Sequence, residues 1–345
     1  MKLTTLLAFS VSLAFAPVAQ AGQAPGLMER NIDAPHHGRA MPFAVWYPAT
    51  QGPTEIFAEN AVFQGGDVHR DVQPSPGKHP LVLLSHGMGG SYLSLNWLAS
   101  GLAESGAIVV SVNHPNGWFR DRDPKTMFNH WTRVQDLQTA LDHVLADKTL
   151  SGVVDNDRIY AAGFSFGGWT ALSIGGATAD LNGNTAYCKA AGERSHNCTD
   201  LEHFGFDPAG TDPARWSASY KDRRIKAIAA IEPGLTWSMG EKDVRDLDQE
   251  KLLVIGLGAG ADRMYPTDTS ATGSGFEALV PKAHIEVIAP AMHFTAMPLC
   301  KPDGAAILAD EKDDPVCTDP KGTDRKLVHD RIITLISSHF QLEQD

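Results

Sequence analysis

Apolar and polar positions along this chain follow two periods, one typical of buried strands and one typical of helices. Short continuous apolar runs predict strands buried on both faces, at residues 80–84, 107–113, 159–162, 225–231, 251–257 and 284–288. Apolar residues three or four apart predict helices, with the positions Leu95, Leu98 and Leu102, then Val134, Leu137, Leu141 and Val144, and later Val328, Ile332, Leu335 and Ile336. Because the two kinds of element alternate, the sequence predicts an α/β fold with a mostly parallel central sheet and helices on both faces.

This periodicity fails between Gly175 and Arg224, where glycine, asparagine, aspartate and proline are frequent. We interpret residues 177–222 as an insertion near the functional site, with a lid as one role for it. A second irregular stretch, residues 116–119, follows the carboxyl end of a predicted strand. It is expected either to form a wall of the substrate pocket or to pack on the insertion.

The first 21 residues have the features of a secretory signal. Met1-Lys2 precedes an apolar run over residues 3–16, and Val18-Ala19-Gln20-Ala21 fits an A-x-A cleavage site. The sequence therefore predicts a signal peptide over residues 1–21, a single domain over residues 22–345, and a periplasmic or secreted protein. No other stretch reaches the ~18 apolar residues that a membrane span requires, so no transmembrane segment is expected after signal removal.

Charge and cysteine content agree with an exported protein. Asp and Glu number 41 against 29 Lys and Arg, which argues against nucleic acid or an anionic membrane as a partner. The four cysteines lie in two local pairs, so the simplest connectivity is Cys188 with Cys198 and Cys300 with Cys317. Zinc is disfavoured because no C-x-x-C spacing or paired histidine accompanies them.

The strongest chemical motif is the hexapeptide GFSFGG at residues 163–168, directly after the strand-like run at 159–162. A serine flanked by glycines two positions away on each side is typical of a sharp turn from strand to helix that exposes the hydroxyl. Glycine is needed because a side chain at either place would collide with the neighbouring backbone. Ser165 is therefore the candidate nucleophile.

A second glycine-rich loop, His86-Gly87-Met88-Gly89-Gly90, follows the strand predicted at 80–84. Loops of this kind supply one backbone N–H to an oxyanion hole, and the residue after the nucleophile supplies the other. The expected donors are the N–H groups of Met88 and Phe166.

A general base and its acid should follow the serine in chain order. His293 lies just after the predicted strand at 284–288, and its imidazole can accept and return a proton near neutral pH. Two carboxylates compete to orient it. Asp262 lies in the loop after the strand at 251–257, and Glu232 ends the strand at 225–231. We favour Asp262 and keep Glu232 as the alternative acid.

These segments together resemble a known family. Residues 80–115, GFSFGG and the late AMHF at 291–294 are similar to the platelet-activating-factor acetylhydrolase and dienelactone-hydrolase-like branch of the α/β-hydrolase superfamily, and residues 41–49 resemble its first strand. The resemblance spans residues 40–340 and implies the α/β-hydrolase fold with Ser165, His293 and the Met88 and Phe166 donors. It leaves the acid open, since acetylhydrolases place it as at Glu232, and related lipases and cutinases as at Asp262. Dienelactone hydrolases proper use a cysteine nucleophile, which argues against a dienelactone substrate.

The predicted function is that of a serine hydrolase cleaving carboxylic esters, of a small molecule or a lipid, through an acyl-enzyme. No metal or organic cofactor and no obligate protein partner is implied. Two alternatives stay open: an amidase or peptidase using the same residues, and a catalytically inactive scaffold used for binding.

Overall fold

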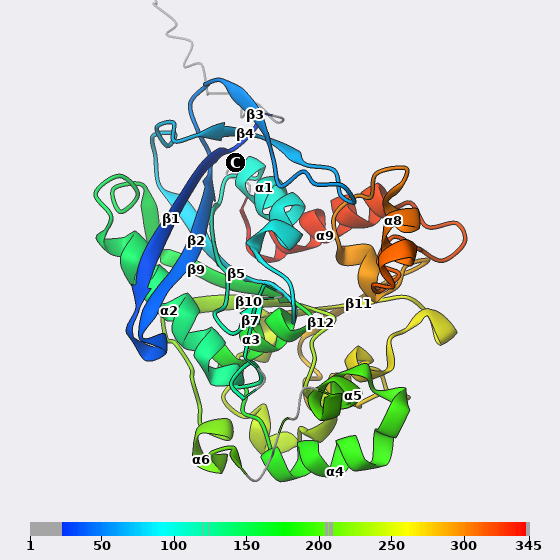
Figure 1. The fold of residues 1–345 in the computed structure, drawn as a ribbon. Helices are drawn as coiled ribbons and strands as arrows, with labels where there is room; N and C mark the ends of the chain where they lie inside the picture. The colour runs from blue at the N-terminus through cyan, green and yellow to red at the C-terminus, as the bar shows by residue number, and fades with distance from the viewer. Residues whose placement is uncertain (1–22, 119, 124, 204–205, 207–209, 343–345) are drawn as a thin grey trace, which may run out of the picture.

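The computed structural model describes residues 23–118, 120–123, 125–203, 206 and 210–342, and in this part of the chain ten strands form one sheet (Figure 1). Their order is β12-β11-β10-β9-β5-β6-β2-β1-β4-β3. The bounds are β1 Gly26–Ala34, β2 Arg39–Tyr47, β3 Thr54–Phe57, β4 Gly66–Arg70, β5 His79–Ser85, β6 Ile108–Val112, β9 Val154–Phe164, β10 Ile225–Ile231, β11 Leu252–Leu257 and β12 His284–Ile288. A separate two-stranded ribbon pairs β7 (Gly117–Trp118) with β8 (Asp121–Arg122).

The six strands from β12 to β6 are parallel, and β2 continues the sheet antiparallel to β6 and β1. In the register of β9 and β10, Phe164 lies opposite Ile231. The residues that follow them, Ser165 and Glu232, therefore leave adjacent strands at the same edge of the sheet. The mostly parallel sheet expected from the alternation of elements is confirmed.

Helices cover both faces of the sheet (Figure 1). α1 and α9 pack against each other on one face, and α2 and α3 pack together on the other. The helix bounds are α1 Asn96–Glu104, α2 His130–Ala146, α3 Phe166–Ile174, α4 Leu181–Ala191, α5 His196–His203, α6 Pro213–Trp216, α7 Phe276–Leu279, α8 Gly304–Glu311 and α9 Arg325–His339. The three helices predicted from apolar spacing correspond to α1, α2 and α9.

The central strand β5 shows why its sequence is apolar throughout. Leu81 and Leu83 join the core under α2 and α3, whereas Val82 and Leu84 join the core under α1 and α9. Successive side chains of a strand point to opposite faces, so a strand covered on both sides needs apolar residues at every position. All four are fully buried.

The segment expected to be an insertion lies between α3 and β10 and contains α4, α5 and α6, in the lower part of Figure 1. A disulfide joins Cys188 of α4 to Cys198 of α5, with 5.2 Å between their Cα atoms. A second joins Cys300 to Cys317 across α8, with Cα atoms 5.9 Å apart. Both predicted pairings are confirmed.

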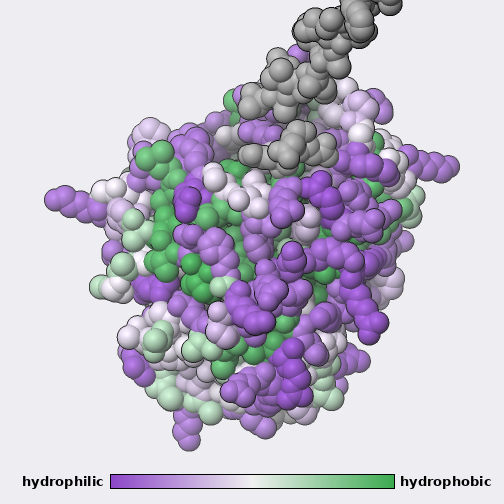
Figure 2. Space-filling view, turned by 180° about the vertical axis from the view of Figure 1, so that it is seen from behind, coloured by the Kyte–Doolittle hydropathy of each residue, from purple (hydrophilic) through white to green (hydrophobic). Residues whose placement is uncertain are grey.

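The surface is mostly hydrophilic on the face that Figure 2 shows, with apolar side chains visible between the polar ones. Among the described residues, no helix combines the length and apolar character needed to cross a membrane. The predicted signal peptide, residues 1–21, lies outside the described residues.

Candidate active site

Ser165 occupies a strained turn between β9 and α3. Its φ is +58° and its ψ is −118°, a conformation that L-residues rarely adopt and that proteins retain mainly at functional sites. Two backbone hydrogen bonds hold it there, from the Ser165 N–H to the Ile231 carbonyl at 2.9 Å and from the Gly234 N–H to the Ser165 carbonyl at 3.1 Å. Strand β10 and the loop that follows it thus hold the strained residue in place.

The glycines around Ser165 are required by close backbone contacts. A Cβ on Gly163 would overlap the carbonyl oxygen of Gly167, and a Cβ on Gly167 would overlap that of Ser85. Each obstacle is backbone, which cannot move aside as a flexible side chain could. The hexapeptide therefore adopts the turn geometry of a nucleophile elbow.

His293 lies beside this turn. It begins η10 (His293–Ala296), follows β12 after a short loop, and is buried. Its ring packs on that of Phe164, the residue before Ser165, with centroids 4.6 Å apart and planes inclined by 34°. Its Nδ1 lies 3.1 Å from Oε2 of Glu232. Because Nδ1 has this partner, Nε2 is the ring nitrogen left to exchange a proton with a substrate or nucleophile.

Glu232 is a buried carboxylate, and both of its oxygens accept hydrogen bonds that fix its position beside His293. It follows β10 with a φ of +49°, and its N–H donates to the Ile255 carbonyl at 2.8 Å. Oε1 accepts from the Leu257 N–H at 2.6 Å. Oε2 accepts from the Thr267 hydroxyl at 2.8 Å and also faces His293. These partners satisfy a buried charge that would otherwise be costly.

Asp262, the acid favoured from the sequence, is not brought to His293. It ends η8 (Gly260–Asp262), and its side chain is exposed. The loop turns tightly there, with the Asp262 N–H donating to the Ala259 carbonyl at 3.2 Å. The next residue, Arg263, is the one that turns inward, where Nη1 pairs with Asp268 at 2.8 Å. The structure therefore brings the alternative acid, Glu232, to the histidine.

The glycine-rich loop after β5 lies against the serine. A Cβ on Gly87 would stand 3.3 Å from the Cβ of Ser165, so the loop backbone approaches Ser165 closely. Gly89, with a φ of +73°, donates its N–H to the Gly117 carbonyl at 2.9 Å. Phe166 is the first residue of α3, where N–H groups have no intrahelical acceptor. The oxyanion role of Met88 and Phe166 stays a prediction, in agreement with this placement.

A buried arginine, Arg133, which the sequence analysis did not identify, donates hydrogen bonds to residues at the start of this glycine-rich loop. Nη2 of Arg133 donates to the His86 carbonyl and, at 3.3 Å, to the Ser85 hydroxyl. The guanidinium lies over the Phe166 ring, 4.9 Å from its centroid. Burial lowers the pKa of Arg133 to about 9, so it stays charged at neutral pH. Its position four residues before Leu137, on the buried stripe of α2, is the sequence signal that could have revealed it.

Apolar side chains gather next to the loop. Met127 and Phe128 are buried, and Met88, Cys188 and Phe206 pack against them. The segment between α3 and β10 thus contacts the loop expected to hold an oxyanion. That segment also contains a cavity of about 350 Å³ lined by Asn184, Thr185, Cys188, Lys189, Gly192, Glu193, Cys198, Thr199, Glu202 and Phe206.

Comparison with known proteins supports the fold. No protein-family model matches the sequence. A ferulic acid esterase from Streptomyces cinnamoneus has a similar structure, with a TM-score of 0.56 and 16% identity over 95% of this chain and 91% of that one. A dienelactone hydrolase from Anabaena variabilis aligns with a TM-score of 0.44 and 12% identity over 84% of this chain and 96% of that one.

One curated relative matches a short part of the sequence. Lipase 1 from Moraxella sp. (strain TA144) is 33% identical over 81 residues, which are 24% of this chain and 23% of the lipase. The match thus spans about a quarter of that relative's length. With the sheet order, the turn at Ser165 and the structural likeness to the esterase, the chain has the α/β-hydrolase fold that the motifs predict.

Proposed function

We propose that this protein is a serine hydrolase that cleaves carboxylic esters, with Ser165, His293 and Glu232 as its catalytic triad. The observation that carries the proposal is the strained Ser165 beside a buried histidine whose Nδ1 is bound to a buried carboxylate. A serine hydroxyl is a weak nucleophile until an adjacent base accepts its proton, and the base in turn needs a group that fixes its tautomer. The three residues supply these roles.

The reaction begins with attack of Ser165 Oγ on the ester carbonyl carbon as Nε2 of His293 accepts the hydroxyl proton. Glu232 stabilises the imidazolium through Nδ1, and the N–H groups of Met88 and Phe166 stabilise the oxyanion. Collapse of the tetrahedral intermediate breaks the bond to the alcohol, which receives the proton from His293. Water, deprotonated by the same nitrogen, then attacks the acyl-serine and releases the carboxylic acid and free Ser165.

An ester is preferred over an amide for two reasons. The structural neighbour is named an esterase and the curated relative a lipase. In addition, the buried side chains of Met127 and Phe128 pack with Met88, the proposed oxyanion donor, and such apolar surroundings suit the apolar part of an ester. The substrate is accordingly a small-molecule or lipid ester with an apolar acyl or alcohol group.

The test is a matched pair, the wild-type chain and Ser165→Ala. We expect the wild type to react covalently with a fluorophosphonate probe and to hydrolyse p-nitrophenyl esters in a series from acetate to palmitate. Ser165→Ala should do neither while keeping the wild-type circular dichroism spectrum. An unlabelled, inactive wild type would favour the binding scaffold, and faster turnover of p-nitroanilides than of esters would favour the amidase.

We also infer that the protein is exported, with residues 1–21 as a cleaved signal. The two disulfides support this, because such bonds persist in oxidising compartments. Expression of the full chain with periplasmic fractionation should give mature protein whose first residue is Gly22. An intact Met1 in a cytoplasmic fraction would contradict the inference.

A further inference from the structure

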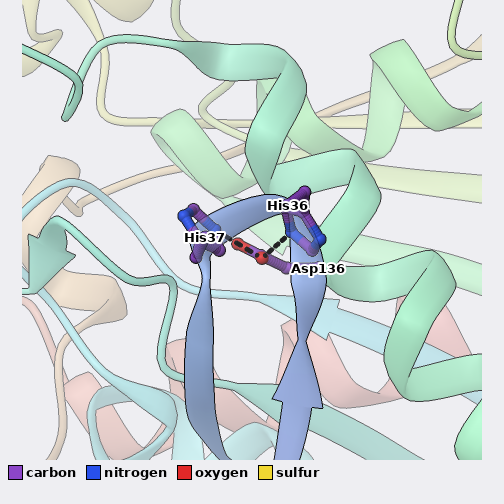
Figure 3. Close-up of side chains that lie close together, drawn as sticks. All are labelled: His36, His37 and Asp136. Atoms are coloured by element: carbon purple, nitrogen blue, oxygen red, sulfur yellow. Dashed lines mark hydrogen bonds and ion pairs between the residues drawn. The ribbon is translucent and has the colours of Figure 1, made fainter.

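Two adjacent histidines and one aspartate form a cluster that the proposed reaction does not use (Figure 3). His36 and His37 lie in η1 (Pro35–His37), the turn between β1 and β2, and Asp136 lies on α2. Both rings point to the same carboxylate oxygen. Nε2 of His36 is 2.7 Å from Oδ1 of Asp136, and Nε2 of His37 is 2.9 Å from it.

The three groups are arranged so that a single ion could contact all of them. Their ligand atoms lie within 4.8 Å of one another. Around a tetrahedral zinc ion with ligand bonds of 2.0–2.1 Å, neighbouring ligand atoms are about 3.3 Å apart. To admit the ion, each imidazole nitrogen must move about half an ångström away from the carboxylate oxygen, and the two nitrogens, at most 4.8 Å apart, must approach each other by up to about 1.5 Å. The movement falls on the turn between β1 and β2, which holds both histidines at the edge of the fold.

The donor set also has the right chemistry. Two imidazole nitrogens and one carboxylate oxygen form the set used by three-ligand zinc sites and by facial sites for other divalent transition metals. With a metal ion bound, each Nε2 exchanges its hydrogen bond for a coordinate bond, and Oδ1 becomes the third ligand. Each neutral imidazole then carries its proton on Nδ1 instead of Nε2, so the exchange of hydrogen bonds for coordinate bonds releases no net proton.

The burial of the three side chains and the further hydrogen bonds of Asp136 favour a preorganised binding site over a chance contact at the surface. The side chain of Asp136 is fully buried, that of His37 is 5% exposed and that of His36 is 17% exposed. The second oxygen of Asp136 accepts from Nδ1 of His114 at 2.8 Å, and Nε2 of His114 lies 2.9 Å from the Ser85 hydroxyl. Hydrogen bonds of this kind orient a ligating carboxylate from outside. The exposed edge of His36 leaves room for water to complete the coordination.

We propose that His36, His37 and Asp136 bind one divalent transition-metal ion, with zinc as the ion tested. The site connects the turn between β1 and β2 to α2. Through His114 and Ser85 it also contacts the start of the glycine-rich loop. The proposal is independent of the hydrolase function, since no catalytic residue takes part.

The experiment uses the untagged mature chain, stripped with EDTA and dialysed, with ZnCl2 titrated by calorimetry and thermal unfolding followed in parallel. We expect one zinc ion per chain and a rise in Tm on saturation, because an ion that binds only the folded state stabilises it. His36→Gln and His37→Gln should each weaken binding by at least about 100-fold, since loss of even an outer partner costs about 10–100-fold. His143→Gln, an exposed histidine on the same helix as Asp136, is the control and should bind as the wild type does.

A second measurement does not depend on how the variants fold. Co²⁺ bound to the wild-type chain should give the visible absorption of a low-coordinate site with nitrogen and oxygen ligands, and added zinc should abolish it. Failure of the wild type to bind zinc saturably, or equal binding by the wild type and both histidine variants, would overturn the proposal.

Discussion

Nδ1 of His293 lies 3.1 Å from Oε2 of Glu232, although 61 residues separate them in the chain. Glu232 reaches this place because it follows β10 at the sheet edge where Ser165 follows β9. The Leu257 N–H donates to its Oε1, and the Thr267 hydroxyl donates to its Oε2. The carboxylate is therefore held toward Nδ1, which makes Nδ1 the protonated nitrogen of neutral His293.

The first prediction tests this acid. Glu232→Gln should lower kcat by about 10⁴, because an amide in this place allows the wrong histidine tautomer, as in other serine hydrolases. Asp262→Asn removes an exposed carboxylate and should leave kcat within about twofold, since surface changes rarely perturb a distant site. Both variants are assayed with a p-nitrophenyl ester after circular dichroism confirms folding. A larger loss in Asp262→Asn would return the role to Asp262.

A second prediction concerns Thr267, which donates to the same oxygen that faces His293. Thr267→Val keeps the shape but removes a hydrogen bond to a charged group, which contributes about 1.5 kcal/mol and corresponds to about tenfold in rate. We expect kcat to fall by that factor with KM unchanged. Thr269→Val is the matched control, because Thr269 donates to a different carboxylate, that of Glu277, at 2.9 Å. An equal fall of kcat in both variants would show that the effect is structural.

The local motifs predict the turn at Ser165 well because its geometry depends on residues close in sequence. The turn at Ser165 needs glycines two residues away on either side, and the structure shows the backbone contacts that exclude a side chain there. The strands and covering helices also follow from apolar periodicity, since each is buried on a face that its own sequence defines.

Local sequence could not predict in the same way which carboxylate lies beside His293. Asp262 and Glu232 both follow predicted strands, and what separates them is the direction of each side chain after its strand ends. Glu232 has a φ of +49°, which turns its carboxylate toward His293, whereas the turn at Gly260, with a φ of +57°, leaves Asp262 outside. Such backbone angles depend on packing against neighbouring strands. The cluster of His36 and His37 with Asp136 escaped notice for a related reason, because about 100 residues separate its members.

A third prediction concerns the disulfides. The Cys300–Cys317 bridge spans 17 residues and the Cys188–Cys198 bridge spans 10. Loop-closure entropy for lengths of this order gives a contribution of about 3 kcal/mol each. We expect the double variant Cys300→Ser, Cys317→Ser to lose that much free energy of unfolding in urea. The oxidised wild type should show no free thiol when denatured and gain four hydrogens in mass on reduction. Four titratable thiols in protein made in the periplasm would contradict the prediction.

The last prediction concerns acid stability and rests on His130, a fully buried histidine among Trp131, Trp169 and Trp216. Its Nε2 lies 3.0 Å from the Trp216 carbonyl oxygen and so carries the proton, whereas Nδ1 is buried and has no partner among the described residues. Protonation would place a second N–H at Nδ1 with nothing to accept it. Burial accordingly lowers the pKa of His130 to about 4 in the folded state.

In the unfolded chain the His130 imidazole has a pKa of about 6.5, so it is protonated at a higher pH than in the folded chain. The free energy of unfolding therefore falls as the pH falls from 6.5 toward 4, and the loss is complete below about pH 4. The loss of free energy of unfolding is on the order of 3 kcal/mol for one such group.

We expect His130→Phe to be less stable at pH 7, where it lacks the hydrogen bond to Trp216, but to lose less free energy of unfolding between pH 7 and 4.5 than the wild type. His143→Gln, at an exposed position of the same helix, should keep the wild-type dependence. Urea unfolding at both pH values measures the difference, and equal pH dependence in the wild type and His130→Phe would remove His130 as a cause of acid instability.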